Sequence, residues 1–392
     1  MPDETMTQPP IPGVLRQDVF PPQAPVFLTG VPAFLGRAAT GPRTPQRLTL
    51  WPQFEAAYGT DPGGFLADTV RGFFDNGGLL CHVVRLDESK QAAAALQAAL
   101  DGLADEVDLV CAPDIVTAAP WPTGGSLVPV VTQQQTLLHH CQERGDRFAL
   151  LDGIPTTDTT KLMQQRAALT RDDGPFGALD GSFAALYYPW LQAAPGGDGA
   201  LRLLPPSGHV AGVYAAGDQR IGVQKAPANA EVAGVVDLQA YLAPADVGAL
   251  YEQGVNCLRA LPGRGIRVWG ARTLAEEQAW RDVNARRLIG TIGRWIERFM
   301  TGLVHEPNDV RLWVRIMREL TAYLDELFRR GALKGRTPAE AFFVKCDHET
   351  NPPAVVAAGV VVTQIGVAPT APAEFVTVRV IHGASGVTVD AA

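Results

Sequence analysis

The sequence predicts a mixed α/β protein of two domains, with an extended segment at each end. Between residues 91 and 191, apolar runs of strand length alternate with helical patterns, which is typical of a layered α/β structure. Residues 269–353 instead hold two long amphipathic helices followed by a short strand. The first 25 residues contain seven prolines and no helical period, so we expect them to lie outside a compact core.

Composition sets the outer bounds of function. The chain has 392 residues, of which 46% are hydrophobic and 19% charged, enough for a large core. A formal charge of −8 argues against a general attraction to nucleic acid or to an anionic membrane. There is no run of about 18 apolar residues and no signal-peptide pattern at the start, so we expect a soluble protein made in the cytoplasm without direct membrane insertion. The five dispersed cysteines favour reduced core thiols over disulfides or a zinc site.

The N-terminal third holds one free strand and the start of a core. Residues 13–20 form an extended run bounded by prolines, a format that suits an edge strand without a partner in its own segment. A core strand is predicted at residues 26–30. Aromatic residues then mark two helices, which end at Asn76-Gly77-Gly78, and a strand follows at residues 79–86.

The middle of the chain alternates regularly. We expect helices at 92–103, 130–144 and 161–170, and strands at 107–112, 147–151 and 183–188. A Pro- and Gly-rich loop at 192–207 and a short helix at 209–216 come next. Further strands are predicted at 255–259 and 266–270.

The two long helices have clear end signals. Thr273 and Glu276 have capping-box spacing, which predicts that a helix of roughly 25 residues starts there. Asn308 or Asp309 can cap the second helix, and Gly331 supplies its left-handed end. A further capping box at residues 337–340 leads into a buried strand at 341–347.

Candidate catalytic or ligand-binding groups all have a stronger structural interpretation. Gly263 and Gly265 lack phosphate-loop spacing and precede a strand. His139, His140 and Cys141 are adjacent on a helix and so face different directions. The acidic loops at 172–173 and 347–349 are typical of solvated charge. An α/β enzyme or ligand-binding protein, with a site at the strand ends of residues 79–188, remains the alternative.

Both termini carry a strand on a Pro-rich tether, the second at residues 372–382. An unpaired strand is a template for pairing with another chain. If strands from one copy add to the sheet of another, the contact is head-to-tail, and such contacts generate helical filaments when they do not close.

A family resemblance is carried by short motifs in the N-terminal segment, at 31–85 and at 254–374. In the first half they are Pro12-Gly13-Val14, Val31-Pro32-Ala33-Phe34-Leu35-Gly36-Arg37 and Phe73-Phe74-Asp75-Asn76-Gly77-Gly78. In the second half they include Val268-Trp269-Gly270-Ala271-Arg272, Arg286-Arg287-Leu288, Glu306-Pro307-Asn308 and Gly331-Ala332-Leu333-Lys334-Gly335. With these residues the chain resembles a contractile tail sheath protein, as in contractile phage tails, R-type pyocins and phage-tail-like injection systems. The aromatic residue expected shortly before Glu306 is absent, and Leu303, Val304 and His305 stand there.

The resemblance implies a structural protein rather than an enzyme, with no cofactor and no catalytic, cofactor-binding or metal-binding residues. It implies an N-terminal arm at 1–25, an α/β peripheral domain at 26–253, a C-terminal core domain with a small sheet at 254–370, and a C-terminal arm at 371–392. The arms would exchange strands between subunits. The residues expected to do so are Val14, Leu15, Arg16, Val19, Phe20, Phe375, Val376, Val378 and Val380.

The partners implied are other copies of the chain, in helically stacked six-membered rings, an inner tube protein, and baseplate and terminator proteins. Contraction drives the tube through a target envelope, and nucleic acid is not a partner. The particle would be assembled in the bacterial cytoplasm as part of a virion or phage-tail-like particle; a phage tail, a pyocin and an injection system stay open. A type VI secretion sheath is disfavoured because it is usually split into two chains. The candidate tube-facing residues are Arg315, Arg318, Arg329, Arg330 and Lys334.

Overall fold

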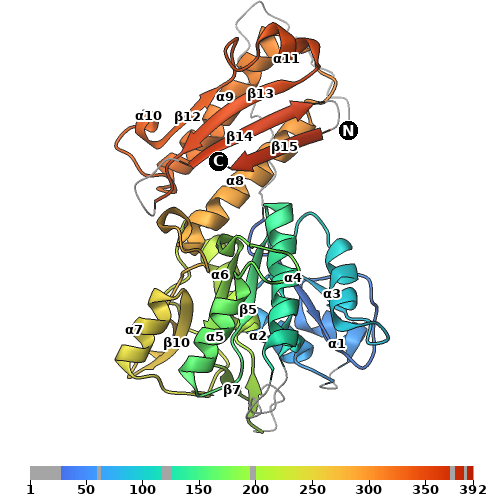
Figure 1. Ribbon diagram of the computed structural model, residues 1–392, viewed down its shortest axis with the longest axis vertical. Coiled ribbons are helices and arrows are strands. Elements are labelled where there is room, and N and C mark those ends of the chain that lie inside the picture. The colour runs from blue at the N-terminus through green and yellow to red at the C-terminus, as the bar shows by residue number, and fades with distance from the viewer. Residues whose placement is uncertain are drawn as a thin grey trace, which may run out of the picture.

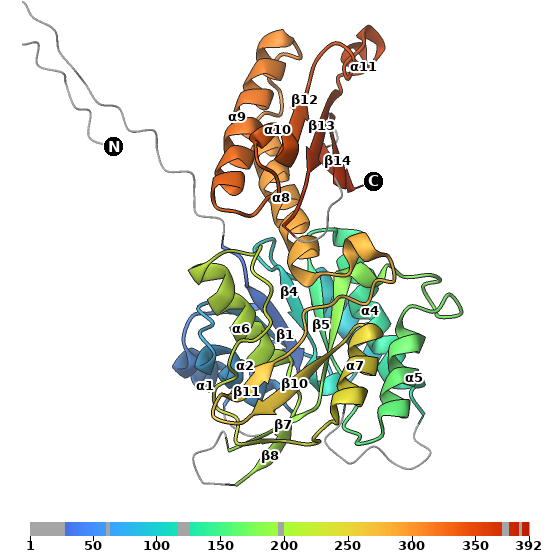
Figure 2. The same cartoon turned by 90° about the vertical axis from the view of Figure 1, so that its left-hand side faces the viewer.

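The computed structural model describes residues 28–59, 63–116, 126–194, 200–370, 376–383 and 386–391. They form two lobes stacked along the long axis, which Figures 1 and 2 show from two sides. The lower lobe is a layered α/β structure, and the upper lobe combines two long helices with a small sheet. The mixed α/β class expected from the sequence is confirmed.

The lower lobe is built on an eight-stranded sheet with the order β11-β10-β6-β5-β4-β1-β3-β2. All neighbours pair in parallel except at the two edges, where β2 and β11 are antiparallel. The strands are β1 (Pro32–Gly36), β2 (Gln46–Leu48), β3 (Cys81–Arg85), β4 (Leu109–Cys111), β5 (Phe148–Asp152), β6 (Ala184–Tyr188), β10 (Val255–Leu261) and β11 (Gly265–Val268). A small sheet with the order β8-β7-β9 extends this lobe and contains β7 (Leu191–Ala193), β8 (Arg202–Leu204) and β9 (Asp237–Leu238).

Helices cover both faces of the large sheet, which explains why its central strands are apolar throughout. One face packs against α1 (Trp51–Tyr58), α2 (Leu66–Asp75) and α6 (Ser207–Arg220). The other packs against α3 (Ala92–Asp101), α4 (Val128–Arg144), α5 (Thr159–Leu169) and α7 (Pro244–Glu252). Side chains of β1 alternate between the two cores, since Leu35 joins one hydrophobic cluster and Phe34 the other.

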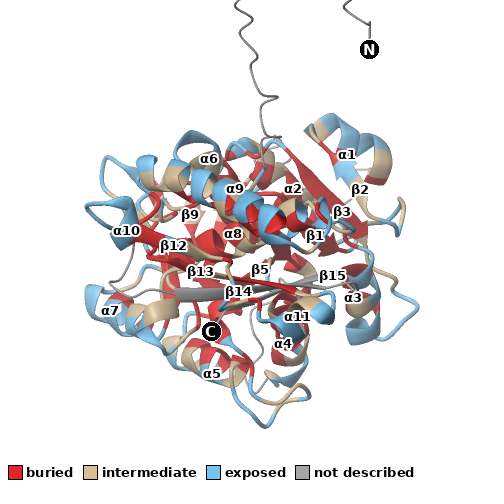
Figure 3. Ribbon diagram, turned by 90° about the horizontal axis from the view of Figure 1, so that it is seen from above, coloured by how far each residue is buried: buried red, intermediate tan, exposed pale blue. Residues whose placement is uncertain are grey.

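The upper lobe contains α8 (Val283–Thr301), α9 (Val310–Arg329), two short helices and a four-stranded antiparallel sheet with the order β12-β13-β14-β15. Seen from above in Figure 3, α8 and α9 lie together on one side of this sheet, and the outward side of α9 is exposed. Leu312, Ile316 and Leu320 recur every four residues and form the buried stripe of α9. The remaining elements are α10 (Pro338–Ala341), β12 (Phe342–Lys345), α11 (Pro353–Ala357), β13 (Val361–Val367), β14 (Val376–Gly383) and β15 (Gly386–Ala391).

Two local expectations differ from the structure. Of the strand expected at 26–30, the first two residues lie outside the described residues, and 28–30 are not in a strand. Strand β1 runs over Pro32–Gly36, after Gly30 turns the chain with a φ of +71°. The first long helix begins at Val283 instead of Thr273. The Thr273 hydroxyl donates to Trp280 O (2.7 Å) and accepts from Ala275 N–H (3.1 Å), so it closes a loop and caps no helix. Within the described residues, no helix is long and apolar enough to span a bilayer.

Two expectations about organisation also differ. The boundary expected after residue 253 falls before β10 and β11, which both belong to the large sheet, so the change of architecture comes at the start of α8. The C-terminal segment was expected to hold one unpaired strand. It forms two, β14 and β15, and β14 pairs with β13 of the same chain over Val376–His382. An open edge of β13 is completed by the nearest available strand, which in a single chain is its own.

Candidate functional site

The strand-exchange residues expected from the sequence are described only in part. Val14, Leu15, Arg16, Val19, Phe20 and Phe375 lie outside the described residues. Val376, Val378 and Val380 lie in β14, opposite Val367, Ile365 and Thr363 of β13. The structure therefore places the C-terminal part of this set on the small sheet of the upper lobe.

The opposite side of that sheet ends in β12. Ala368 N–H donates to Ala341 O (2.8 Å), which makes 341/368 a hydrogen-bonded pair of the β12–β13 ladder. Such pairs alternate along an antiparallel ladder, so the backbone groups of Phe342 and Val344 face away from β13. Phe342 N–H donates a hydrogen bond to Pro338 O of α10. The N–H of Val344 and the carbonyls of both residues are thus aimed at the outer edge of the sheet.

A shallow groove of about 440 Å³ runs beside this edge, between α9 and β12. Its floor is largely apolar and includes Met317, Ala322, Pro338 and Phe342. Val310 and Val314 on α9 are each about half exposed, and Phe343, on the opposite face of β12 from Phe342, is 44% exposed. An extended segment that adds to the outer edge of β12 would find backbone partners and apolar contacts at the same place.

The candidate tube-facing arginines lie on the exposed side of α9 or just after it, and four of them pair with acids close by in the sequence. Arg318 contacts Glu319 (2.7 Å) and Arg315 contacts Glu306 (3.5 Å). Arg329 contacts Asp325 (2.5 Å), and Arg330 contacts Glu326. The positive charge of this face is therefore offset within the chain. Exposed pairs of this kind are each worth about 0–1 kcal/mol, so they can exchange for a partner's acids at little cost.

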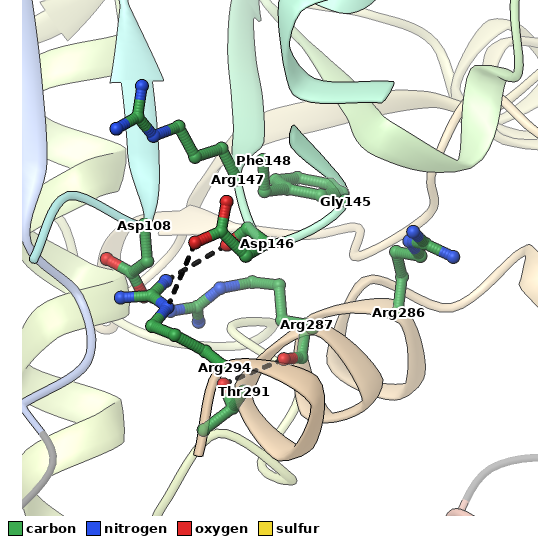
Figure 4. A pocket seen from close by; sticks show the side chains of 10 residues that line it. Asp108, Gly145, Asp146, Arg147, Phe148, Arg286, Arg287, Thr291 and Arg294 are labelled. Carbon is green, nitrogen blue, oxygen red and sulfur yellow. Dashed lines mark hydrogen bonds and ion pairs between the residues drawn. The ribbon is translucent and has the colours of Figure 1, made fainter. Parts of the chain in front are cut away.

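The junction of the two lobes holds a buried charged cluster that the sequence reasoning did not single out. The first half of α8 lies on the amino ends of the parallel strands, where Asp108 precedes β4 and Asp146 precedes β5 (Figure 4). Arg287 reaches Asp108 (3.2 Å) and Asp218 (2.5 Å), and all three side chains are at most 5% exposed. Two turns further along α8, Arg294 donates to the backbone carbonyls of Asp146 and Glu106.

Arg286 behaves differently from its neighbours. Its side chain points away from the acids in Figure 4. The guanidinium instead lies 3.5 Å from the ring centroid of Phe183 and 5.0 Å from that of Trp280. Burial lowers its pKa to about 10. The cation is held by aromatic faces and by the distant charge of Asp180, which together fix the entry of α8 into the junction.

The lower lobe has one small cavity at the junction with α8 and one polar cavity elsewhere. The space between Asp108, Asp146 and the α8 arginines is about 10 Å³, which suits one water molecule. A second cavity of about 230 Å³, at the carboxyl ends of β1 and β3, is lined partly by Arg43 and Arg85. Those arginines are engaged in the chain, with Asp87 (3.0 Å) and Ala39 O (3.1 Å) respectively.

The enzyme alternative places a site at the strand ends of residues 79–188, and the end of β5 is occupied by contacts within the chain. Asp152 ends β5, and its carboxylate accepts from the backbone N–H (2.8 Å) and hydroxyl (2.7 Å) of Ser207. Gln134 and Gln165 both donate to the Asp152 carbonyl. In the described part of the chain, no group of three or more His, Cys, Asp or Glu side chains is placed to hold a metal ion. The arrangement favours structure over chemistry, and the alternative is not favoured.

The described residues form two lobes, with β12 at an open edge of the upper sheet and a buried charged cluster where the lobes meet. Comparison with known proteins gives the family. The model of the phage tail sheath protein central domain matches residues 89–274, and the model of the phage tail sheath C-terminal domain matches residues 275–381. The chain belongs to the phage tail sheath family.

Individual relatives agree with this assignment. The tail sheath protein of Burkholderia phage BcepMu is 29% identical over 203 residues, which cover 47% of this chain and 40% of that protein. The sheath of an extracellular contractile injection system, PVC, in its contracted state is 27% identical, with a TM-score of 0.72 over 94% of this chain and 97% of that one. The contracted helical sheath of the anti-feeding prophage is 26% identical, with a TM-score of 0.72 over 93% and 97%. The chain spans between 26% and 40% of the length of the curated phage relatives it matches.

Proposed function

We propose that this protein is the sheath subunit of a contractile particle, that it polymerises helically around an inner tube, and that its contraction drives the tube through a target envelope. The observation that carries the proposal is the match of both lobes, over more than nine tenths of the chain, to two sheaths solved in the contracted state. Contraction of this kind needs no covalent chemistry. It needs subunits that bury more surface when they rotate, and contacts that survive the rotation.

Strand exchange supplies contacts of that kind. The outer edge of β12 and its apolar groove can accept the N-terminal segment of a second copy, whose residues 13–20 have the required extended, apolar character. At the other side of the sheet, β14 pairs with β13 in the single chain, and β15 pairs with β14. The same hydrogen bonds form if these strands are given to a neighbouring copy, so exchange costs little in backbone pairing. A Pro-rich stretch joins each segment to the core, after the N-terminal segment and before the C-terminal one, and permits the exchange.

The remaining partners belong to the same proposal. They are other copies in stacked six-membered rings, an inner tube protein, and baseplate and terminator proteins, with assembly in the bacterial cytoplasm before the particle acts. The exposed arginines of α9 are the proposed tube contact, because weak, solvent-screened charge pairs can break as the sheath widens.

Electron microscopy of the purified full-length protein, alone and co-expressed with the tube protein from the same gene neighbourhood, tests the proposal. Striated tubes are the expected result. Deletion of residues 1–22 should abolish tubes while leaving the circular dichroism spectrum and melting of the core unchanged. Globular particles of the full-length protein under both conditions would contradict the proposal.

The tube contact has a separate test. A double charge reversal, Arg318→Glu with Arg329→Glu, should reduce the yield of extended sheath around tube, and the effect should weaken with added salt. Arg220→Glu, on α6 of the lower lobe, is the matched control. Unchanged co-assembly of the double variant would remove the α9 contact and leave the sheath proposal standing.

A further inference from the structure

The root of the N-terminal segment and helix α8 share one buried carboxylate. Asp108 accepts hydrogen bonds from Gly30 N–H (2.9 Å) and Val31 N–H (2.6 Å), the residues where the N-terminal segment joins the core. The same carboxylate contacts Arg287 of α8 (3.2 Å). A Cβ atom at Gly30 would lie 2.6 Å from Ala215 Cα of α6, so the root is seated against that helix in one position.

A second carboxylate closes the cluster. Asp218, near the end of α6, accepts hydrogen bonds from both terminal nitrogens of Arg287, at 2.9 and 2.5 Å. It also accepts a hydrogen bond from the Thr29 side chain, again at the root of the N-terminal segment. Arg287 is thus the one cation between two buried carboxylates, and its removal would leave two negative charges facing each other away from water.

The far half of α8 belongs to the other lobe. Ile292, Ile296 and Met300 lie in the hydrophobic core that α8 shares with α9 and the small sheet. A helix of 19 residues is about 28 Å long and does not bend easily, so displacement of one end moves the other. The described contacts therefore form an unbroken path from the N-terminal root, through Asp108, Asp218 and Arg287, to the upper lobe.

We propose that these three residues, the α8 joint, carry load from the N-terminal segment to the upper lobe, and that the joint stays closed while the sheath contracts. The inference rests on the proposed function, in which the N-terminal segment ties neighbouring copies together. If the joint opened under that load, the lobes would separate and the rotation of one subunit would not be passed to the next.

A cross-link across the joint tests this directly. A Cβ atom at Gly290 of α8 would lie 3.8 Å from Asp146 Cα, which is compatible with disulfide geometry, and the native cysteines are all buried. Gly290→Cys with Asp146→Cys should give extended sheaths that contract to the wild-type length when oxidised and when reduced. Oxidised sheaths that stay extended and contract on addition of a reductant would overturn the proposal.

A measurement on the unassembled subunit separates failure of this inference from failure of the proposed function. Spin labels are attached at Ala98→Cys on α3 and Ala322→Cys on α9, both exposed, and the distance distribution between the lobes is recorded. Arg287→Met should broaden that distribution, whereas Arg281→Met, at a partly exposed arginine of the preceding loop, should leave it narrow. An unchanged distribution in a folded Arg287→Met protein would overturn the inference even if wild-type tubes form.

Rescue distinguishes coupling from general loss of structure. Arg287→Met alone should reduce the number of contraction-competent sheaths at least severalfold. Addition of the Gly290→Cys and Asp146→Cys cross-link should restore them under oxidising conditions, because the disulfide replaces the mechanical connection without restoring the charges. Failure of the oxidised triple variant to exceed the reduced one would count against a load-bearing role.

Discussion

The carboxylate of Asp152 has the buried position that makes a single residue sensitive to pH. Burial raises its pKa from 3.8 to about 7, against the opposing effect of the two hydrogen bonds from Ser207. Burial lowers the pKa of both His140 and His209 to about 4. The acid and the histidines therefore act on stability in opposite directions over the same pH range.

The direction in which Asp152 changes the free energy of unfolding with pH follows from proton binding. Between pH 4 and 7 the folded state keeps Asp152 protonated while the unfolded state releases the proton. The contribution of Asp152 to the free energy of unfolding is therefore complete below about pH 4 and is lost as pH rises to about 7. A difference of about three between the two pKa values corresponds to roughly 4 kcal/mol as an upper bound.

We predict that Asp152→Asn removes this pH dependence. The amide can accept from Ser207 N–H and donate to the hydroxyl, so the fold is kept. Denaturant unfolding at pH 4.5 and 7.5 measures the effect: relative to the wild type, the variant should gain about 2–4 kcal/mol between the two pH values. The histidines are present in both proteins and cancel in this difference. A gain near zero would mean that Asp152 is ionised in the folded protein at neutral pH.

Gly30 provides a second prediction at the scale of one residue. Its φ of +71° and the 2.6 Å approach to Ala215 Cα leave no room for a side chain. Gly30→Ala should lower the free energy of unfolding by about 2–4 kcal/mol. The matched control is Gly217→Ala in α6, where nothing lies within 4 Å and loss of helix-interior glycine should stabilise by about 0.5–1 kcal/mol. Equal effects from the two variants would contradict a tight seat at Gly30.

Individual residues differed in how well their roles could be predicted from the sequence. Asp309 caps α9 as expected, because a cap acts on N–H groups two and three residues away, here those of Arg311 and Leu312. The partners of Arg287 could not be predicted in this way, since Asp108 and Asp218 are 179 and 69 residues distant in the chain. A usable signal was present: Arg287 and Arg294 interrupt an apolar helix pattern seven residues apart, and a charge in such a position needs a buried partner.

At the scale of elements, β12 allows a test of strand addition that leaves the subunit intact. Val344 N–H faces away from β13, so a proline there removes an outward donor without removing a bond of the chain's own ladder. We predict that Val344→Pro abolishes or strongly reduces tube formation while the melting temperature changes by no more than a few degrees. Val344→Ala keeps the N–H group and should assemble normally. Normal tubes from the proline variant would show that β12 accepts no strand.

The elements of the lower lobe were largely predictable because their apolar runs have one period each. Helices α3 to α5 and strands β3 to β6 fall within a few residues of the expected ranges. The strands of the C-terminal segment were harder to predict from the sequence. Gly383 and Gly386 separate two alternating runs, a hairpin signal, but the second run is too short to predict a strand by its pattern alone. Which strand pairs with β13 depends on which chains are present, and a single sequence does not contain that information.

At the scale of the whole molecule, the proposed donor and acceptor of strand exchange are different parts of the chain: the N-terminal residues and the edge of β12. Contacts built from unlike surfaces are heterologous, so a growing assembly needs both features on every copy. A copy that lacks residues 1–22 keeps β12 and its groove, and can still accept a strand. It cannot donate an N-terminal strand to the next copy.

This asymmetry predicts that the truncated protein inhibits assembly when it is mixed with full-length protein. With one truncated copy in ten, roughly half of six-membered rings would contain at least one missing connection. Sheaths formed from such mixtures should be shorter or fragmented in electron micrographs, with a median length that falls as the truncated fraction rises. The double variant that also carries Val344→Pro should inhibit assembly far less, because it can neither donate nor accept and stays out of the lattice. Equal shortening by both truncated proteins would indicate that copies are held mainly by contacts other than exchanged strands.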